Sequence, residues 1–135
     1  VGKNNLKQIE TPTKNYIQIE FAQDIEDYFD ASDIVISRAG SNTIFELLAI
    51  KKPMILIPLP KGSSRGDQIL NAENFEKHGL ANIIYQEDLN TSTLLNKINY
   101  TLQNKAKYIS AMSKSNFSCG NEKIISLIDK VSINK

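Results

Sequence analysis

The sequence predicts an α/β fold, an open and mostly parallel sheet with helices on both faces. Short apolar runs alternate with segments of helical periodicity, and the connections between them are short. The chain of 135 residues is long enough for one domain with a packed core, and neither an internal repeat nor a linker marks a second one. We therefore expect a single sheet assembled from βα units.

Four apolar runs predict strands at residues 16–21, 33–37, 54–59 and 81–86. The first run alternates between apolar and polar side chains, which is typical of an edge strand with one wetter face. The second and third runs are continuous and rich in β-branched residues, so we expect them in the middle of the sheet, covered on both faces.

Helical periodicity separates the last three of these runs. Residues 43–51 and 67–78 carry apolar stripes, the second formed by Ile69, Leu70, Ala72 and Phe75. Pro53 stops the first helix before the next strand, and Gly79 is placed as a left-handed cap of the second. From residue 90 onward the pattern is wholly helical, with a last apolar stripe at residues 124–131.

Composition excludes several function classes. Sixteen basic and fifteen acidic side chains give a net charge of +1, which provides no electrostatic case for nucleic acid or for an anionic membrane. The only cysteine, Cys119, cannot form an internal disulfide, and with His78 as the only histidine a zinc site built on Cys and His is excluded. We expect no metal. No apolar run reaches the roughly 20 residues that a spanning helix needs.

The loop after the second run offers a seat for a phosphate. Residues 37–43 read Ser-Arg-Ala-Gly-Ser-Asn-Thr and lead directly into a helix. Gly40 would permit a tight turn, and the helix start presents unpaired N–H groups and a positive dipole end to an anion.

Ordinary helix capping is the alternative interpretation of the same residues. Thr43 with Glu46 forms a capping-box pattern, and Ser41 or Asn42 could also cap the helix. Capping and anion binding can coexist, because they use different N–H groups.

The two arginines point to the same end of the sheet. Arg38 and Arg65 are the only arginines among sixteen basic residues, and each lies in a loop that follows a predicted strand. Arginine suits bidentate recognition of phosphate or carboxylate. The alternative is a structural ion pair, for Arg38 with Asp33 or Glu46. The second loop, residues 58–67, has no Walker pattern, and the chain has no Gly-x-Gly-x-x-Gly motif.

Three segments together resemble a known family. They are Ala-Ser-Asp-Ile-Val-Ile-Ser-Arg-Ala-Gly-Ser-Asn-Thr-Ile-Phe-Glu-Leu-Leu from Ala31, Lys-Pro-Met-Ile-Leu-Ile-Pro-Leu from Lys52, and Ser-Arg-Gly-Asp-Gln-Ile-Leu-Asn-Ala from Ser64. The set strongly resembles the donor-binding half of the MurG family, bacterial N-acetylglucosaminyltransferases of peptidoglycan synthesis, in a form similar to the Gram-positive variant. The resemblance implies a Rossmann-like domain, the C-terminal half of a two-domain GT-B enzyme.

The resemblance also implies an activity and a place. Such an enzyme transfers N-acetylglucosamine from UDP-N-acetylglucosamine to the lipid-linked muramyl-pentapeptide called lipid I, with inversion, and forms lipid II. It works at the inner face of the bacterial cell membrane as a peripheral protein and serves cell wall biogenesis, cell shape and division. UDP-N-acetylglucosamine is then a substrate, so no cofactor is implied.

Residue roles follow from the positions that match the family's motif. Glu46 would hold the ribose hydroxyls, Arg38 and the helix start would meet the diphosphate, and Asp67 with Gln68 would face the sugar hydroxyls. Most relatives have a second glutamine where this chain has Asp67. The implied substrate-binding set is Arg38, Gly40, Ser41, Asn42, Thr43, Glu46, Arg65, Asp67 and Gln68.

One departure from the family concerns the beginning of the chain. Val1-Gly-Lys-Asn-Asn matches the family after its first strand and glycine loop, so residues 1–135 are expected to form a partial, N-terminally truncated donor-binding domain. The acceptor domain, which would bind lipid I, and the general base are then expected outside this chain. We expect the isolated chain to be inactive, and its uncovered strand edges favour self-association.

Two other function classes compete with this interpretation. The chain could be a noncatalytic UDP-sugar-binding subunit of a two-chain glycosyltransferase, which a separately encoded catalytic partner would favour. A generic α/β signalling domain is the other class. It would need a phosphoacceptor aspartate after an apolar strand, where this chain has Ser37 and Arg38.

Overall fold

The computed structural model describes residues 15–63 and 66–119. The chain consists of two compact units, and the boundary between them lies between Ala31 and Ser32. In the first unit, the helix α1 spans Ile25–Ala31 and has acidic residues in its first turn, where the helix dipole favours negative charge. Within the described residues, no helix is long and apolar enough to span a bilayer.

Residues 16–21 do not form the predicted edge strand. They run as irregular chain, and Ile17 and Phe21 are 80% and 78% exposed. Alternating apolar residues stabilise a strand only when a neighbouring strand accepts its backbone hydrogen bonds. Within the described residues, the only strands that pair belong to the second unit.

The second unit contains a parallel three-stranded sheet in the order β1-β2-β3. β1 spans Val35–Ser37, β2 spans Met54–Leu56 and β3 spans Asn82–Ile83. Val35 pairs with Met54 at the start of β2, and Leu56 pairs with Ile83. The three carboxyl ends therefore lie side by side, which is where ligands bind in open α/β sheets.

The prediction of two central strands is half confirmed. β2 lies in the middle and all three of its residues are fully buried. β1 is at the edge of the described sheet, and its Ile36 is 40% exposed. A run rich in β-branched residues indicates a parallel strand, but it does not say how many neighbours that strand has.

The helices α2, Ser41–Ala49, and α3, Asp67–Lys77, connect these strands. They pack together through Phe45 and Phe75, whose rings lie edge to face with their centroids 5.6 Å apart. Gly79 follows α3 with φ 69°, which confirms the predicted left-handed cap.

The predicted stripe of α3 is corrected at one position. Ala72 and Phe75 are buried and Ile69 is partly buried, but Leu70 is 68% exposed. A helix presents adjacent residues 100° apart, so Ile69 and Leu70 cannot both face the core squarely.

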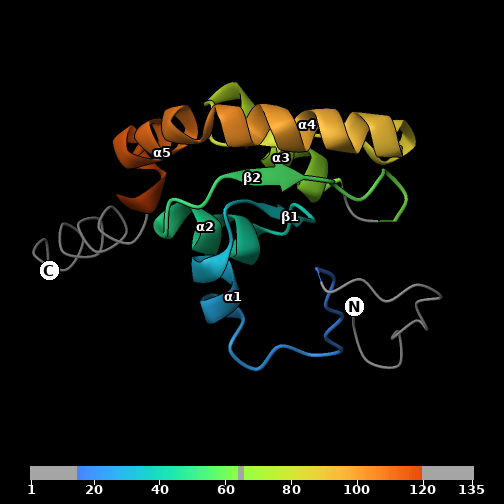
Figure 1. The fold of residues 1–135 in the computed structure, drawn as a ribbon. Helices are drawn as coiled ribbons and strands as arrows, with labels where there is room; N and C mark the ends of the chain where they lie inside the picture. Colours follow the sequence, from blue (N-terminus) through green and yellow to red (C-terminus); the bar gives the residue numbers. More distant parts are fainter. Residues whose placement is uncertain (1–14, 64–65, 120–135) are drawn as a thin grey trace, which may run out of the picture. The chain divides into compact units, whose positions relative to one another are not determined.

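The remaining elements come after the sheet. A 3-10 turn η1, Gln86–Asp88, precedes α4, Thr91–Gln103, which is followed by α5, Lys105–Lys114, and by η2, Asn116–Cys119. In Figure 1, α4 runs along one side of β2 while α2 lies on the other side, so the sheet has helices on both faces as predicted. The predicted stripe at residues 124–131 lies outside the described residues.

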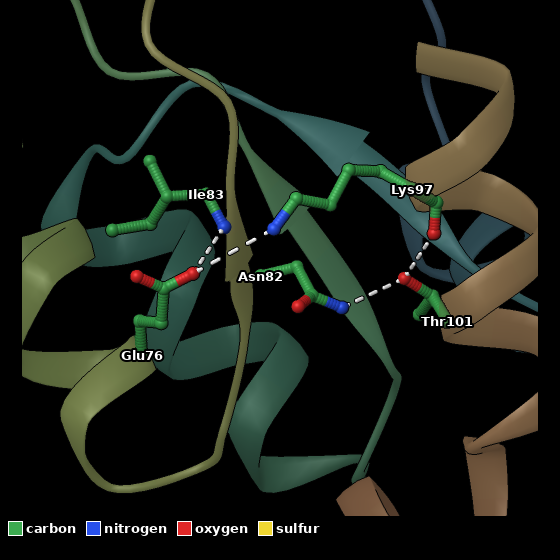
Figure 2. A network of polar contacts seen from close by, with 5 residues as sticks. All are labelled: Glu76, Asn82, Ile83, Lys97 and Thr101. Atoms are coloured by element: carbon green, nitrogen blue, oxygen red, sulfur yellow. Dashed lines mark hydrogen bonds and ion pairs between the residues drawn. The ribbon is translucent and has the colours of Figure 1, made fainter. Parts of the chain in front are cut away.

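A cluster of polar contacts fixes β3 between its two neighbouring helices (Figure 2). The buried Asn82 donates to the hydroxyl of Thr101 on α4 at 2.8 Å, and that hydroxyl donates to the Lys97 carbonyl at 2.7 Å. On the other side, the Glu76 carboxylate of α3 accepts the backbone N–H of Ile83 at 3.0 Å and lies 4.0 Å from the Lys97 ammonium. Glu76 thereby occupies a backbone donor of β3 that does not pair with β2.

Candidate functional site

The loop after β1 places an uncapped helix start at the carboxyl end of the sheet. α2 begins at Ser41, its N-cap is Gly40, and no side chain caps it. The predicted capping box is therefore wrong, because Thr43 lies inside the first turn and a glycine occupies the cap position. The first-turn N–H groups are left to water or to a ligand.

Gly40 has a different role from the one its sequence position suggests. Its φ of −68° and ψ of 137° are accessible to any residue, so the turn does not require glycine. A Cβ built at Gly40 would meet no atom within 4 Å. The position beside the helix start is thus open space, and an anion can approach the N–H groups closely there.

Arg38 forms neither of the two ion pairs weighed from the sequence. Asp33 instead pairs with Lys105 at 2.7 Å, and this contact lowers the pKa of the Asp33 carboxyl. In the described part of the chain, Glu46 has no ion pair with Arg38 and lies exposed on α2. Glu46 lies one turn after Thr43, on the same side of the helix.

Neutral oxygens hold the Arg38 guanidinium. Its Nη1 donates to the backbone carbonyl of Ile57 at 3.1 Å and to the side-chain Oε1 of Gln86 at 2.7 Å. Arg38 follows β1, Ile57 follows β2 and Gln86 follows β3 after two residues. One cationic side chain thus crosses the carboxyl ends of all three strands.

Two amide side chains of α3 fix the loops around this site. Gln68 accepts the backbone N–H of Leu59, in the loop after β2, at 3.2 Å. Asn71 lies three residues further along the helix and donates to the carbonyl of the buried Ala39 at 3.2 Å. The start of α3 therefore holds the loop after β1 and the loop after β2 in fixed positions.

Of the predicted set, eight residues can be placed. Arg38, Gly40 and the first turn of α2 follow the end of β1, whereas Gln68 is bonded to Leu59 in the loop after β2. Asp67 is the exposed first residue of α3, where the helix dipole already favours a carboxylate. Arg65 lies outside the described residues.

Asn71 and Gln86 are the site residues that sequence reasoning missed. Asn71 had a signal, because it lies one helical turn after Gln68 and so projects from the same side of α3. Gln86 follows the last strand much as Arg38 follows the first, which is the same positional signal.

Gln86 also lines a cavity of about 370 Å³ beside the loop after β2. The charged residues around this cavity are Lys61, Glu73 and Glu87. Glu73 accepts the Tyr85 hydroxyl at 3.1 Å, and burial together with this acidic partner raises the pKa of Tyr85. Because two of the three charges are negative, the start of α2 suits a diphosphate better than this cavity does.

A larger cavity, of about 610 Å³, lies at the opposite end of α3. It is lined by His78, Lys114 and Phe117 among others. The His78 ring bonds to the Asn74 carbonyl at 2.7 Å and meets the Phe117 ring at 5.0 Å. α3 begins near the carboxyl end of β2, so its far end is removed from the carboxyl ends of the strands, where ligands of such sheets bind.

Comparisons with known proteins identify the family of the chain. Residues 1–128 match the family described as the glycosyltransferase family 28 C-terminal domain. A protein of Clostridium botulinum (strain Loch Maree / Type A3), named UDP-N-acetylglucosamine--N-acetylmuramyl-(pentapeptide) pyrophosphoryl-undecaprenol N-acetylglucosamine transferase, is 50% identical over 130 residues. A protein of the same name from Clostridium tetani (strain Massachusetts / E88) is 46% identical over 130 residues.

The alignments cover nearly all of this chain but only part of each related protein. The matches span 96% of this chain but only 37% of the C. botulinum protein and 36% of the C. tetani protein. The crystal structure of Acinetobacter baumannii MurG superimposes with a TM-score of 0.65 at 24% identity, over 83% of this chain and 33% of that one. This likeness confirms the predicted Rossmann-like fold. The family match over residues 1–128 shows that the chain belongs to the glycosyltransferase family 28 C-terminal domain family.

Proposed function

We propose that this chain is the donor-binding part of an inverting glycosyltransferase. Its donor would be UDP-N-acetylglucosamine, and its acceptor the lipid-linked muramyl-pentapeptide, which becomes lipid II. Relatives of 46–50% identity carry the name of an N-acetylglucosamine transferase with this acceptor. The observation that carries the proposal is the open, uncapped start of α2 beside Arg38, a cation held by neutral oxygens.

The site divides naturally among the parts of a nucleotide sugar. The diphosphate would lie against the N–H groups of Ser41, Asn42 and Thr43, close to Arg38. Glu46, one turn further along α2, would accept hydrogen bonds from the two ribose hydroxyls. Asp67 and Gln68 would reach the hydroxyls of the sugar. In this assignment, no metal or cofactor is needed to hold the donor.

The chemistry asked of these residues is stabilisation of the leaving group. As the acceptor oxygen bonds to the anomeric carbon from the opposite face, the bond between that carbon and the diphosphate oxygen breaks. UDP leaves with the bonding electrons, and negative charge grows on its diphosphate. In this proposal, the helix start and the guanidinium of Arg38 would stabilise that charge. The acceptor's proton would pass to a general base, which we place outside this chain.

The remaining parts of the proposal concern partners and place. Because the chain spans little more than a third of its relatives, lipid I would bind to another part of the protein. An acceptor anchored in the membrane implies work at the inner face of the bacterial membrane.

Titration of the chain with nucleotides tests the proposal. The folded 135-residue chain should bind UDP and UDP-N-acetylglucosamine, measured by NMR chemical-shift changes so that weak binding is still resolved. ADP is the matched control, because it keeps the diphosphate and changes the base. Preference for the uridine nucleotides supports the proposal, whereas a folded chain that binds neither, or binds ADP equally well, contradicts it.

An activity assay tests the division between this chain and the rest of the protein. Labelled UDP-N-acetylglucosamine and a lipid I analogue are incubated with the chain alone and with the chain joined to an acceptor domain. Only the joined form should transfer sugar, and light scattering on the same samples reports self-association. Turnover by the chain alone would contradict the assignment of the base to another part of the protein.

A further inference from the structure

Arg38 has a flexible side chain, and the structure fixes the end of it. Two bonds converge on Nη1, one from the carbonyl after β2 and one from Gln86. The contact with Gln86, at 2.7 Å, is the shorter, and the two residues are 48 positions apart in the chain. A guanidinium can only donate hydrogen bonds, so Gln86 presents its amide oxygen to Arg38.

Gln86 itself rests on a rigid base. It begins the turn η1, in which Asp88 N–H bonds to the Tyr85 carbonyl at 3.0 Å. The strand just before it is held by β2 on one side and by Glu76 on the other. Gln86 is partly buried, whereas Arg38 is exposed. The glutamine therefore restricts the arginine, and not the reverse.

The chemistry of the partner matters as much as its position. A carboxylate at residue 86 would also hold Arg38, but it would neutralise the guanidinium. An amide oxygen and a backbone carbonyl hold it without compensating its charge. Arg38 then keeps its full positive charge and further N–H donors for an anion, with its rotamers already restricted.

We propose that Gln86 is a positioning residue, whose neutral side chain holds Arg38 toward the donor's diphosphate. This inference rests on the proposed function. It assigns Gln86 no contact with the substrate, because its effect passes through Arg38. Gln86 is therefore expected to matter for nucleotides with a diphosphate and to be silent for the nucleoside alone.

A double-mutant cycle tests this coupling. Gln86→Met keeps the length of the side chain and removes the acceptor, and Arg38→Met removes the cation. Each variant, the double variant and the wild-type chain are titrated with UDP and with uridine. Gln103→Met is the matched control, because this glutamine is exposed at the end of α4.

The expected pattern is specific to positioning. Gln86→Met should weaken UDP binding about 3- to 10-fold, the range for one lost hydrogen bond, and leave uridine binding unchanged. Arg38→Met should weaken UDP more, and the double variant should be no weaker than Arg38→Met alone. Gln103→Met should change neither affinity. Gln86→Glu should also weaken UDP, although it keeps the acceptor, because it neutralises Arg38.

Four results would overturn the inference. Equal losses for uridine and UDP would indicate a structural role, and additive losses in the double variant would show that Gln86 acts without Arg38. Full UDP affinity in Gln86→Met would remove its role altogether, and full affinity in Gln86→Glu would contradict the need for a neutral partner. These four results leave UDP binding by the wild-type chain intact, so they contradict the role of Gln86 alone. If the folded wild-type chain does not bind UDP, the proposed function fails together with the inference.

Discussion

Two polar regions of this chain differ in whether their polar groups are buried and bonded within the protein or exposed to solvent. In the first region, Asn82 of β3 and Thr101 of α4 are buried and bond to each other. At the carboxyl ends of the strands, the start of α2 has no side-chain cap and Glu46 projects into solvent. Buried polar groups must find partners within the protein, whereas exposed ones can wait for a ligand. The first region should therefore govern the stability of the fold, and the second should govern binding.

Asn82→Ala should give the largest change in stability. The amide bonds to Thr101, and burial raises the pKa of Tyr108 while a hydrogen bond with Asn82 opposes that rise. Truncation removes the donor that Asn82 offers to the Thr101 hydroxyl and opens a small void in the core, so we expect the free energy of unfolding to fall by about 2–3 kcal/mol. Urea denaturation measures this loss. UDP affinity of the folded fraction should stay unchanged.

Asn96→Ala is the control for that measurement. Asn96 is exposed on the same helix as Thr101, and alanine favours helix, so stability should hold or rise slightly. A similar loss in both variants would show that the buried contact of Asn82 has no special weight.

Glu46→Ala should show the opposite pattern. A carboxylate that accepts two ribose hydroxyls contributes on the order of 1.5–3 kcal/mol, so affinity for UDP and for UDP-N-acetylglucosamine should fall together by that amount. Stability should hardly change, because the side chain is exposed and caps nothing. Calorimetric titration gives the affinities, with Glu26→Ala on α1 as an exposed control. Unchanged affinity in a folded Glu46→Ala chain would remove Glu46 from the site.

Gly40→Ala tests whether Gly40 is needed to leave space for a ligand or to allow a backbone conformation that other residues avoid. Gly40 has an extended conformation, so stability should change by less than about 1 kcal/mol. The added methyl group would enter the open space beside the helix start, and UDP affinity should fall about 10-fold.

Gly66→Ala gives the matched contrast. Gly66 has φ 83°, so alanine there should cost about 1 kcal/mol or more of stability through strain. Thermal denaturation and UDP titration of both variants decide the question. Unimpaired UDP binding by Gly40→Ala would place the diphosphate elsewhere.

Gln68→Glu should have the smallest effect and the sharpest selectivity. The amide oxygen of Gln68 accepts the Leu59 N–H, and its NH₂ group is a donor that can reach the sugar. Glutamate retains the acceptor for Leu59 and loses that donor. Affinity for UDP-N-acetylglucosamine should fall by about 0.5–1.5 kcal/mol relative to UDP. Gln103→Glu serves as the exposed control, and an equal loss for both nucleotides would move Gln68 away from the sugar.

Elements with a local sequence pattern were predictable without the structure. Continuous β-branched runs predicted β1 and β2, and Gly79 predicted the end of α3. Periodicity predicted α2, whose observed start is two residues earlier than expected. These features depend on the conformational preferences of neighbouring residues, which the order of amino acids expresses directly.

Tertiary structure decided which predicted elements and contacts exist. Residues 16–21 had the alternation of a strand, but in the described part of the chain they are not part of the sheet. From the sequence, Arg38 could have formed an ion pair with a nearby carboxylate. In the structure the ends of three strands lie side by side, and Arg38 bonds to Gln86 there. Thr43 and Glu46 matched a capping box, but the helix began at Ser41. The first two outcomes depend on which distant groups meet in space, and spacing along the chain does not specify that. The third depends on where the helix begins, which the capping pattern alone did not determine.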